Sequence, residues 1–164
     1  MAEAQRADSG KAERYAALRP EIAAVIAGEP NRIARYASAA AMLAQAFSER
    51  FFWTGFYLVD ADKGDALVVG PYQGTLGCLR MGFGDGVCGT AAARRETIVV
   101  PDVHAFPGHI ACDSRSNSEI VVPVFDAANA LAAVLDVDST AFDAFDAVDR
   151  AGLESICADL LTLP

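Results

Sequence analysis

The amino-acid sequence predicts a single α+β domain with a central antiparallel β-sheet and flanking helices. Its 164 residues match the usual size of one domain, and 53% of them are hydrophobic, which is enough for a self-sufficient core. Helical segments come first, strand-like segments follow, and one helical segment closes the chain, an order typical of α+β folds. We expect residues 1–10 to form a disordered polar tail and residues 11–164 to form the domain.

Two alanine-rich segments with helical spacing open the domain, at residues 11–28 and 31–48. Gly28 and Pro30 separate them, and Asn31 is placed to cap the second helix. Apolar residues recur every three or four positions in the second segment, at Ile33, Tyr36, Ala40, Leu43 and Phe47. A similar apolar stripe predicts a final helix over residues 143–161.

Strand-like segments occupy the middle of the chain. Residues 51–59 and 66–73 are rich in aromatic and β-branched residues, and residues 60–65 between them form a hairpin-type turn. A bend at an edge is expected at Gly70-Pro71, because proline cannot donate a ladder hydrogen bond. Further strands are expected at residues 76–80, 97–100, 119–124 and 130–137.

Two segments between the strands have unusual compositions. Residues 82–89 are rich in glycine and lead into a short helix at about residues 90–95, but their spacing fits neither the Walker nor the dinucleotide pattern. Residues 102–118 form a long irregular stretch that contains both histidines and one cysteine. Irregular segments of this length are commonly functional, so we expect this stretch to contribute to the site.

Charge and hydropathy exclude several classes of protein. Thirteen Lys and Arg against 22 Asp and Glu give a formal net charge of −9, and the densest basic pair is Arg94-Arg95. We therefore expect binding neither to nucleic acid nor to an anionic membrane. The N-terminus lacks the apolar region of a secretory signal, and no apolar run reaches the ~18–20 residues that span a bilayer. A cytoplasmic protein is expected, in which four cysteines indicate catalytic, redox or metal chemistry rather than structural disulfides.

Three acidic residues are candidates for one pocket. Asp136 and Asp138 share a face of their strand, and Glu119 begins another strand. Carboxylates on one apolar face resist ionising together unless a cation, a proton or a ligand ammonium balances them. If the two faces meet, the three acids line one pocket. The alternative is that they lie at solvated strand ends.

Two aromatic residues share a face of the first strand. Trp53 and Tyr57 flank Gly55, and the missing side chain leaves a slot that the two rings wall. The alternative is that both rings pack in the core, where large aromatic residues are common.

The four cysteines lie in different settings. Cys88 follows the glycine-rich loop at the start of a helix, where free N–H groups and the helix dipole stabilise a thiolate. Cys112 lies in the long irregular segment, a placement that suits a reactive thiol. Cys157 lies on the final helix and is expected to be a small buried hydrophobe.

A zinc site is an alternative use of the thiols. Its candidate ligands are Cys78, Cys88, His104, His109 and Cys112. Structural zinc sites usually show closely paired ligands, and no CxxC pair occurs here, so we expect no metal. The two histidines could instead assist a thiolate or anchor the loop by hydrogen bonds, and we favour the anchoring role.

A series of short motifs, in this order along the chain, resembles the GAF-domain free methionine-(R)-sulfoxide reductases. The motifs are FWTGFY at residues 52–57, GPYQG at 70–74, CLR at 78–80, GDGVCGT at 84–90, DVH at 102–104, PGHIACD at 107–113, SNSEIV at 116–121 and LDVDS at 135–139. The resemblance runs from about residue 30 to the C-terminus. Met81, where an aliphatic isoleucine is common, is a mild departure from the family pattern.

The resemblance implies a cytosolic GAF fold, often dimeric, that reduces free L-methionine (R)-S-oxide with electrons from thioredoxin. It makes Cys112 the attacking thiol, Cys78 the main resolving thiol and Cys88 the alternative partner. No prosthetic group is required. Attack on the sulfoxide leaves a sulfenic acid, which a second thiol converts to a disulfide that thioredoxin reduces.

The acids and aromatic residues described above suit this chemistry. The sulfoxide oxygen leaves only if it is protonated, and crowding among Glu119, Asp136 and Asp138 keeps a carboxyl proton available near neutral pH. The same acids can pair with the substrate ammonium, while Trp53 and Tyr57 enclose the S-methyl group. Two alternatives are a GAF module that senses a small ligand without chemistry and a thiol redox switch or peroxidase.

Overall fold

The computed structural model describes residues 2–162, and of residues 2–9 it describes the backbone alone. Six antiparallel strands form one sheet in the order β3-β2-β1-β6-β5-β4. The strands are β1 (Trp53–Val59), β2 (Ala66–Gln73), β3 (Arg80–Gly82), β4 (Ile98–Val100), β5 (Ser118–Phe125) and β6 (Leu131–Ser139). The helices are α1 (Ala2–Ile26), α2 (Arg32–Ala46), α3 (Gly86–Arg94), the 3-10 helix η1 (Val103–Ala105) and α4 (Ala147–Leu160). The predicted α+β class with a flanked antiparallel sheet is confirmed.

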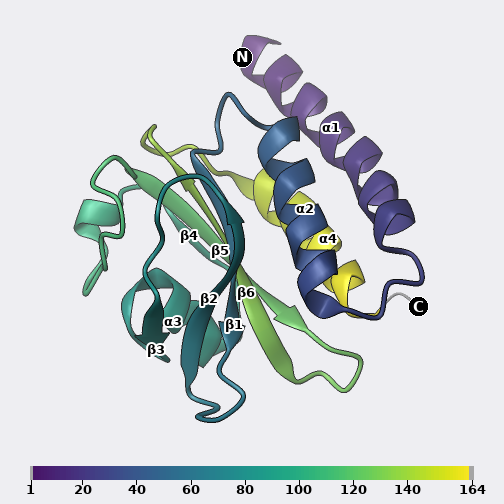
Figure 1. Ribbon diagram of the computed structural model, residues 1–164. Helices are drawn as coiled ribbons and strands as arrows, with labels where there is room; N and C mark the ends of the chain where they lie inside the picture. The colour runs from purple at the N-terminus through teal and green to yellow at the C-terminus, as the bar shows by residue number, and fades with distance from the viewer. Residues whose placement is uncertain (1, 163–164) are drawn as a thin grey trace.

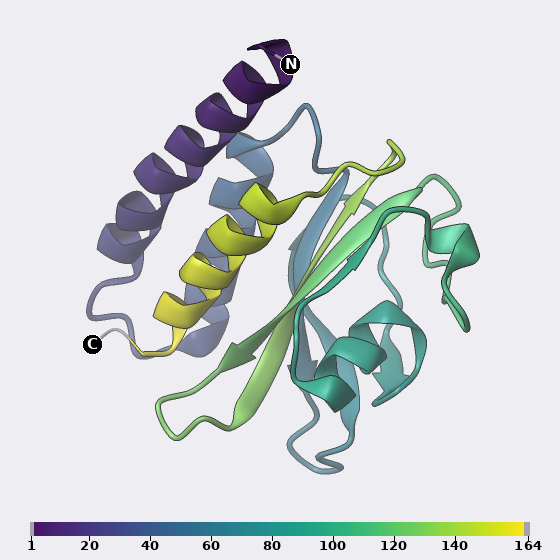
Figure 2. The same ribbon diagram turned by 180° about the vertical axis from the view of Figure 1, so that it is seen from behind.

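The two faces of the sheet are covered differently (Figures 1 and 2). Helices α1, α2 and α4 lie together over one face, where Phe56, Ile120 and Leu135 are fully buried. The opposite face packs against α3 alone among the α-helices, through a smaller apolar cluster that includes Tyr57 and Val121. The connection from β2 to β3 and the segment between η1 and β5 line a pocket on this second face.

Side-chain capping fixes where α2 and α4 begin. Asn31 accepts hydrogen bonds from the first turn of α2, as the sequence predicts. Asp146 and Asp149 form a reciprocal capping box at the start of α4. Asp149 is fully buried and also receives hydrogen bonds from Lys11 at 2.8 Å and Tyr15 at 3.0 Å. This ionic contact ties α1 to α4.

Several element boundaries differ from the expected ones. Helix α1 begins at Ala2 rather than near residue 11, and β3 lies at Arg80–Gly82 rather than at residues 76–80. Helix α3 begins at Gly86, so it includes the second half of the expected glycine-rich loop. The expected division into a tail over residues 1–10 and a domain over residues 11–164 stays a prediction.

The bend expected at Gly70-Pro71 is a bulge. Tyr72 pairs with Gly55 and Val69 pairs with Tyr57, so the ladder between β1 and β2 shifts register between these pairs. Strand β3 pairs only with residues 66–68 of β2, which leaves the proline beyond its reach. A residue without an N–H group is tolerated at such a position.

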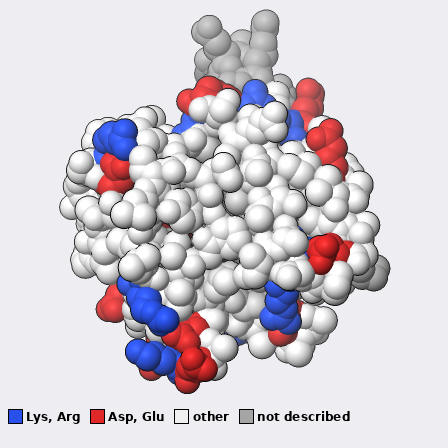
Figure 3. Space-filling model, in the orientation of Figure 1, with Lys and Arg blue, Asp and Glu red and all other residues white. Residues whose placement is uncertain are grey.

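Charged side chains on the face in Figure 3 lie in small mixed groups around a largely uncharged centre, so the described residues present no continuous basic surface there. Within residues 2–162, no helix combines the length and the apolar composition needed to cross a membrane.

Candidate functional site

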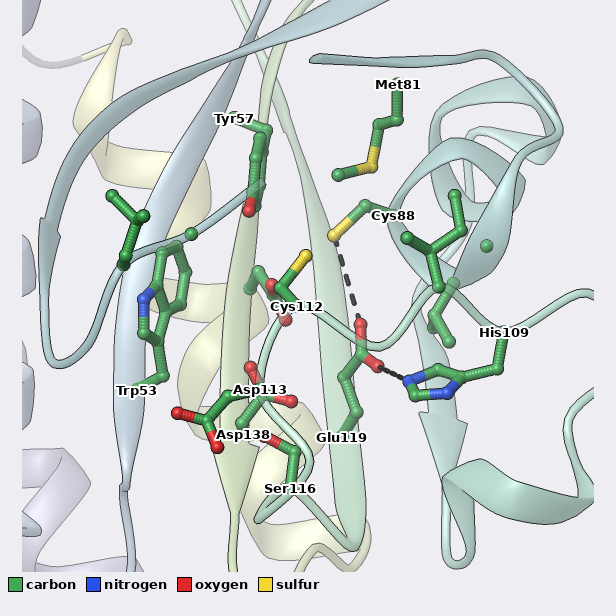
Figure 4. Close-up of a pocket in the computed structure, with 16 residues that line it drawn as sticks. Trp53, Tyr57, Met81, Cys88, His109, Cys112, Asp113, Ser116, Glu119 and Asp138 are labelled. Carbon is green, nitrogen blue, oxygen red and sulfur yellow. Dashed lines mark hydrogen bonds and ion pairs between the residues drawn. The ribbon is translucent and has the colours of Figure 1, made fainter. Parts of the chain in front are cut away.

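A pocket opens on the sheet face that α3 covers only in part (Figure 4). Its floor comes from β1, β5 and β6, one wall from the first turn of α3, and the cover from the segments around residues 76–81 and 109–116. The lining residues are Trp53, Tyr57, Leu76, Gly77, Met81, Gly86, Val87, Cys88, His109, Ile110, Cys112, Asp113, Ser116, Glu119, Asp136 and Asp138. None of them is a lysine or an arginine.

Strand register brings the three predicted acids onto one face. Glu119 of β5 lies opposite Asp138 of β6, and Asp136 lies opposite Val121. On its other side β6 pairs with β1, so Asp138 also lies opposite Trp53. Residues directly opposite in an antiparallel pair point to the same face. The expectation that the two faces meet is confirmed, and the alternative of solvated strand ends is wrong, since Glu119 and Asp136 are each only 6% exposed.

Burial keeps protons on this cluster. It raises the pKa of Asp136 to about 7. Burial, together with the charge of Asp136, raises the pKa values of Glu119 and Asp138 well above their ordinary range. Three crowded carboxyl groups with no lysine or arginine beside them in the pocket therefore retain protons near neutral pH.

Cys88 lies among these acids. Its Sγ is 3.9 Å from Glu119 Oε1, and its side chain is buried in the first turn of α3. Burial, followed by the charges of Asp136 and Glu119, raises the pKa of this thiol well above its ordinary value. The expectation of a thiolate stabilised by the helix is therefore wrong, because desolvation and three nearby acids outweigh one short helix terminus.

Cys78 and Cys112 form a disulfide, with Cα atoms 5.4 Å apart. Cys112 is exposed and Cys78 is half-buried, so the bond can be reached from solvent. A second contact joins the same two segments, because Thr75 Oγ1 donates a hydrogen bond to Asp113 Oδ2 at 2.8 Å. Arg115 donates to both oxygens of Asp113 and thereby holds the pKa of that carboxyl well below its usual range.

The two predicted aromatic residues line the pocket, but the space over Gly55 is filled. The Trp53 ring stacks against Tyr57 with centroids 5.7 Å apart, and against Tyr72 with centroids 5.1 Å apart. A Cβ placed on Gly55 would lie 2.7 Å from the indole and 2.2 Å from Tyr72 Cβ. The expected open slot is therefore wrong: the glycine lets the indole lie across the strand.

The histidines differ in their surroundings. His104 Nε2 lies 3.0 Å from Asn117 Oδ1, which confirms its loop-anchoring role. His109 Nε2 lies 3.8 Å from Glu119 Oε2 inside the pocket, and its pKa is lowered by burial and by the charge of His104. Figure 4 shows its ring turned toward the glutamate.

Two further expectations concern cysteines. Cys157 of α4 is buried in the core that α1, α2 and α4 form with the sheet, as predicted. The alternative zinc set that includes both Cys78 and Cys112 is not assembled, because these two thiols are bonded to each other.

Sequence reasoning missed several polar residues around the site. Ser116 is buried in the pocket and hydrogen-bonds to Asp138, and Thr75 and Asp113 join the two cysteine segments. The position of Asp113 directly after Cys112 was the available signal. Ser116 offered no signal of comparable strength, since serine is common in irregular segments.

Known proteins share this fold and are similar in sequence over most of the chain. The chain matches the GAF domain family over residues 33–161. It is 47% identical over 146 residues to GAF domain-containing protein A of Dictyostelium discoideum, a match that covers 89% of each chain. It is 45% identical over 150 residues to the free methionine-R-sulfoxide reductase of Escherichia coli (strain K12), covering 92% of this chain and 88% of that protein. The X-ray structure of a free methionine-R-sulfoxide reductase from Neisseria meningitidis, in complex with its substrate, superposes with a TM-score of 0.86 at 47% identity, covering 92% and 87% of the two chains.

Proposed function

Because the chain belongs to the GAF-domain family and is related over most of its length to free methionine-R-sulfoxide reductases, we propose that it reduces free L-methionine (R)-S-oxide to L-methionine. One observation carries the proposal. An accessible pair of cysteines at disulfide distance adjoins a pocket lined by three acids, of which Glu119 and Asp136 are buried. In such a site the reduced cysteine pair supplies two electrons. The acids supply a proton and the negative charge that binds an ammonium group.

In this proposal the pocket binds both the ammonium group and the side chain of a free amino acid. Glu119, Asp136 and Asp138 hold the substrate ammonium, which supplies the positive charge that the lining residues lack. Trp53 and Tyr57 present ring surface to the S-methyl group. A peptide-bound residue has no ammonium group, so this cradle favours the free amino acid.

Cys112 begins the reaction by attacking the sulfoxide sulfur. A carboxyl group of the acid cluster protonates the oxygen, and the products are L-methionine and a sulfenic acid on Cys112. Cys78 then attacks the sulfenic sulfur, a disulfide forms and one water leaves. In the balance, two thiols lose two electrons and the sulfoxide gains them.

Cys78 is the resolving thiol that the contacts favour. It is bonded to Cys112 and half-exposed, whereas Cys88 is buried and the raised pKa of its thiol makes it a weak nucleophile. Cys88 stays the alternative partner.

Thioredoxin is the proposed electron donor, by exchange with the disulfide. Cys112 is exposed, and Leu76 and Leu79 beside Cys78 are 76% and 70% exposed, so the bond is surrounded by apolar surface that a protein reductant can cover. A cytoplasmic location and a homodimer remain expectations from the family resemblance. The chemistry proposed here needs no bound cofactor.

The test is turnover on three substrates with a thioredoxin system as reductant. Free L-methionine (R)-S-oxide, its (S) epimer and a peptide-bound (R)-sulfoxide are compared for the unchanged protein and for C112S. C157S is the matched control, because it removes a buried thiol on the opposite side of the sheet. We expect turnover of the free (R) form alone, lost in C112S and kept in C157S. No turnover with all thiols reduced would favour a ligand sensor, and activity in C112S would assign the attack to another thiol.

A further inference from the structure

Three ligand-bearing side chains converge at the base of the pocket, apart from the disulfide. Cys88 Sγ and one carboxylate oxygen each from Glu119 and Asp136 all lie within 4.8 Å of one another. The three residues come from α3, β5 and β6, so the sheet and one helix fix their relative positions. All three side chains are buried.

An independent feature of the cluster is a buried polar atom that lacks a partner. Asp136 Oδ1 is buried and has no hydrogen-bond partner among the described residues. A buried carboxylate oxygen without a partner is costly, and no lysine or arginine lines the pocket. The cluster therefore needs either retained protons or a bound cation.

We propose that Cys88, Glu119 and Asp136 form a binding site for a zinc-type divalent cation. One sulfur and two carboxylate oxygens are ligands that Zn²⁺ accepts, and separations below 4.8 Å allow all three to reach one ion. The thiol selects against Mg²⁺ and Ca²⁺, which prefer oxygen ligands alone. Binding releases the Cys88 thiol proton and the carboxyl protons to solvent, because the metal coordinates the deprotonated groups.

A fourth ligand position is open to a nitrogen or to water. His109 Nε2 lies 3.8 Å from the second oxygen of Glu119, on the side facing the pocket. This set differs from the zinc set suggested by the sequence, because it uses neither Cys78 nor Cys112. The site therefore exists while the disulfide is intact, and an ion there fills the space assigned above to the substrate ammonium.

Cobalt is the first probe, because a thiolate bound to Co²⁺ gives a charge-transfer band in the near ultraviolet. The oxidised protein is used without reductant, so that Cys88 and Cys157 are its free thiols. We expect the band in the unchanged protein and in C157S, and its absence in C88S. Added Zn²⁺ should abolish the band at one equivalent, whereas Mg²⁺ in excess should leave it.

Zinc affinity gives the second measurement, by competition with a chromophoric chelator. Loss of a direct ligand in C88S should weaken Zn²⁺ binding about 100-fold or more, since even outer partners of metal ligands contribute about 10–100-fold. E119Q, which keeps the shape of the side chain, should also weaken Zn²⁺ binding. This second variant keeps the test decisive if C88S does not fold. No cobalt band in the unchanged protein, or equal Zn²⁺ affinity in C88S and C157S, would overturn the proposal. Neither measurement depends on reductase turnover, so the two proposals fail separately.

Discussion

Replacing Asp136 by asparagine should flatten the dependence of stability on pH. Burial raises the pKa of this carboxyl from 3.8 in the unfolded chain to about 7 in the fold. A group with a raised pKa in the folded state stabilises the protein fully below its unfolded pKa, and that contribution is lost as pH rises through about 7. The unchanged protein should therefore lose stability between about pH 4 and about pH 8.

The size of the effect follows from the same pKa values. The difference between 3.8 and about 7, at about 1.4 kcal/mol for each pH unit, gives about 4 kcal/mol. In Asp136→Asn this contribution disappears. The charge of Asp136 also raises the pKa values of Glu119 and Asp138, so their share of the slope should shrink as well. At alkaline pH the variant should be more stable than the unchanged protein.

The assay is urea denaturation of the oxidised protein, followed by circular dichroism, at several pH values across this range. Asp62→Asn is the matched control, because Asp62 is an exposed carboxyl in the turn after β1. Between about pH 4 and about pH 8, we expect the free energy of unfolding to fall by at least about 4 kcal/mol less in Asp136→Asn than in the control. Equal slopes in the two variants would refute the argument that burial of Asp136 sets the pH dependence.

Three further substitutions test contacts around the site and the helices. Thr75→Val removes the hydrogen bond to Asp113 and should lower the equilibrium constant for disulfide formation against glutathione about fivefold, and an unchanged constant would show that the contact does not hold the two segments together. Gly55→Ala places a Cβ within 2.2 Å of the neighbouring strand and should cost about 1–3 kcal/mol in urea denaturation, whereas a neutral result would mean that β2 can move aside. Lys11→Met leaves Asp149 buried without its closest cation and should cost about 3 kcal/mol, most of which a second change, Asp149→Asn, should recover; no recovery would assign the loss to packing.

Local sequence patterns predicted much of the sheet. Strand β2 occupies residues 66–73 as expected, because the turn residues before it define where the hairpin reverses. The pairing of the acids was also predictable in part, since alternation placed Asp136 and Asp138 on one face. Whether Glu119 would lie beside these two acids depended on the register between β5 and β6, and local sequence patterns do not determine that register. The partnership of Cys78 with Cys112 came only from the resemblance to a family.

Long-range surroundings explain the expectations that were wrong. Cys88 has the local features of a reactive thiol, but the acids that raise its pKa lie on β5 and β6, 31 or more residues further along the chain. The sequence showed that Gly55 leaves space on its strand, but it did not show which side chain fills that space. The indole fills it because the bulge in β2 brings Tyr72 alongside.

Trp53 is the one tryptophan of the chain. Its ring stacks against two tyrosines, lines the pocket, and donates its N–H to the carbonyl of Thr75 at 2.8 Å, three residues before Cys78. The protein therefore carries its own fluorophore at the point where ligand, disulfide and loop meet. The proposed binding of substrate, the proposed binding of a metal ion and the reduction of the disulfide would each change the surroundings of this indole, so its intrinsic emission offers a label-free measurement of all three.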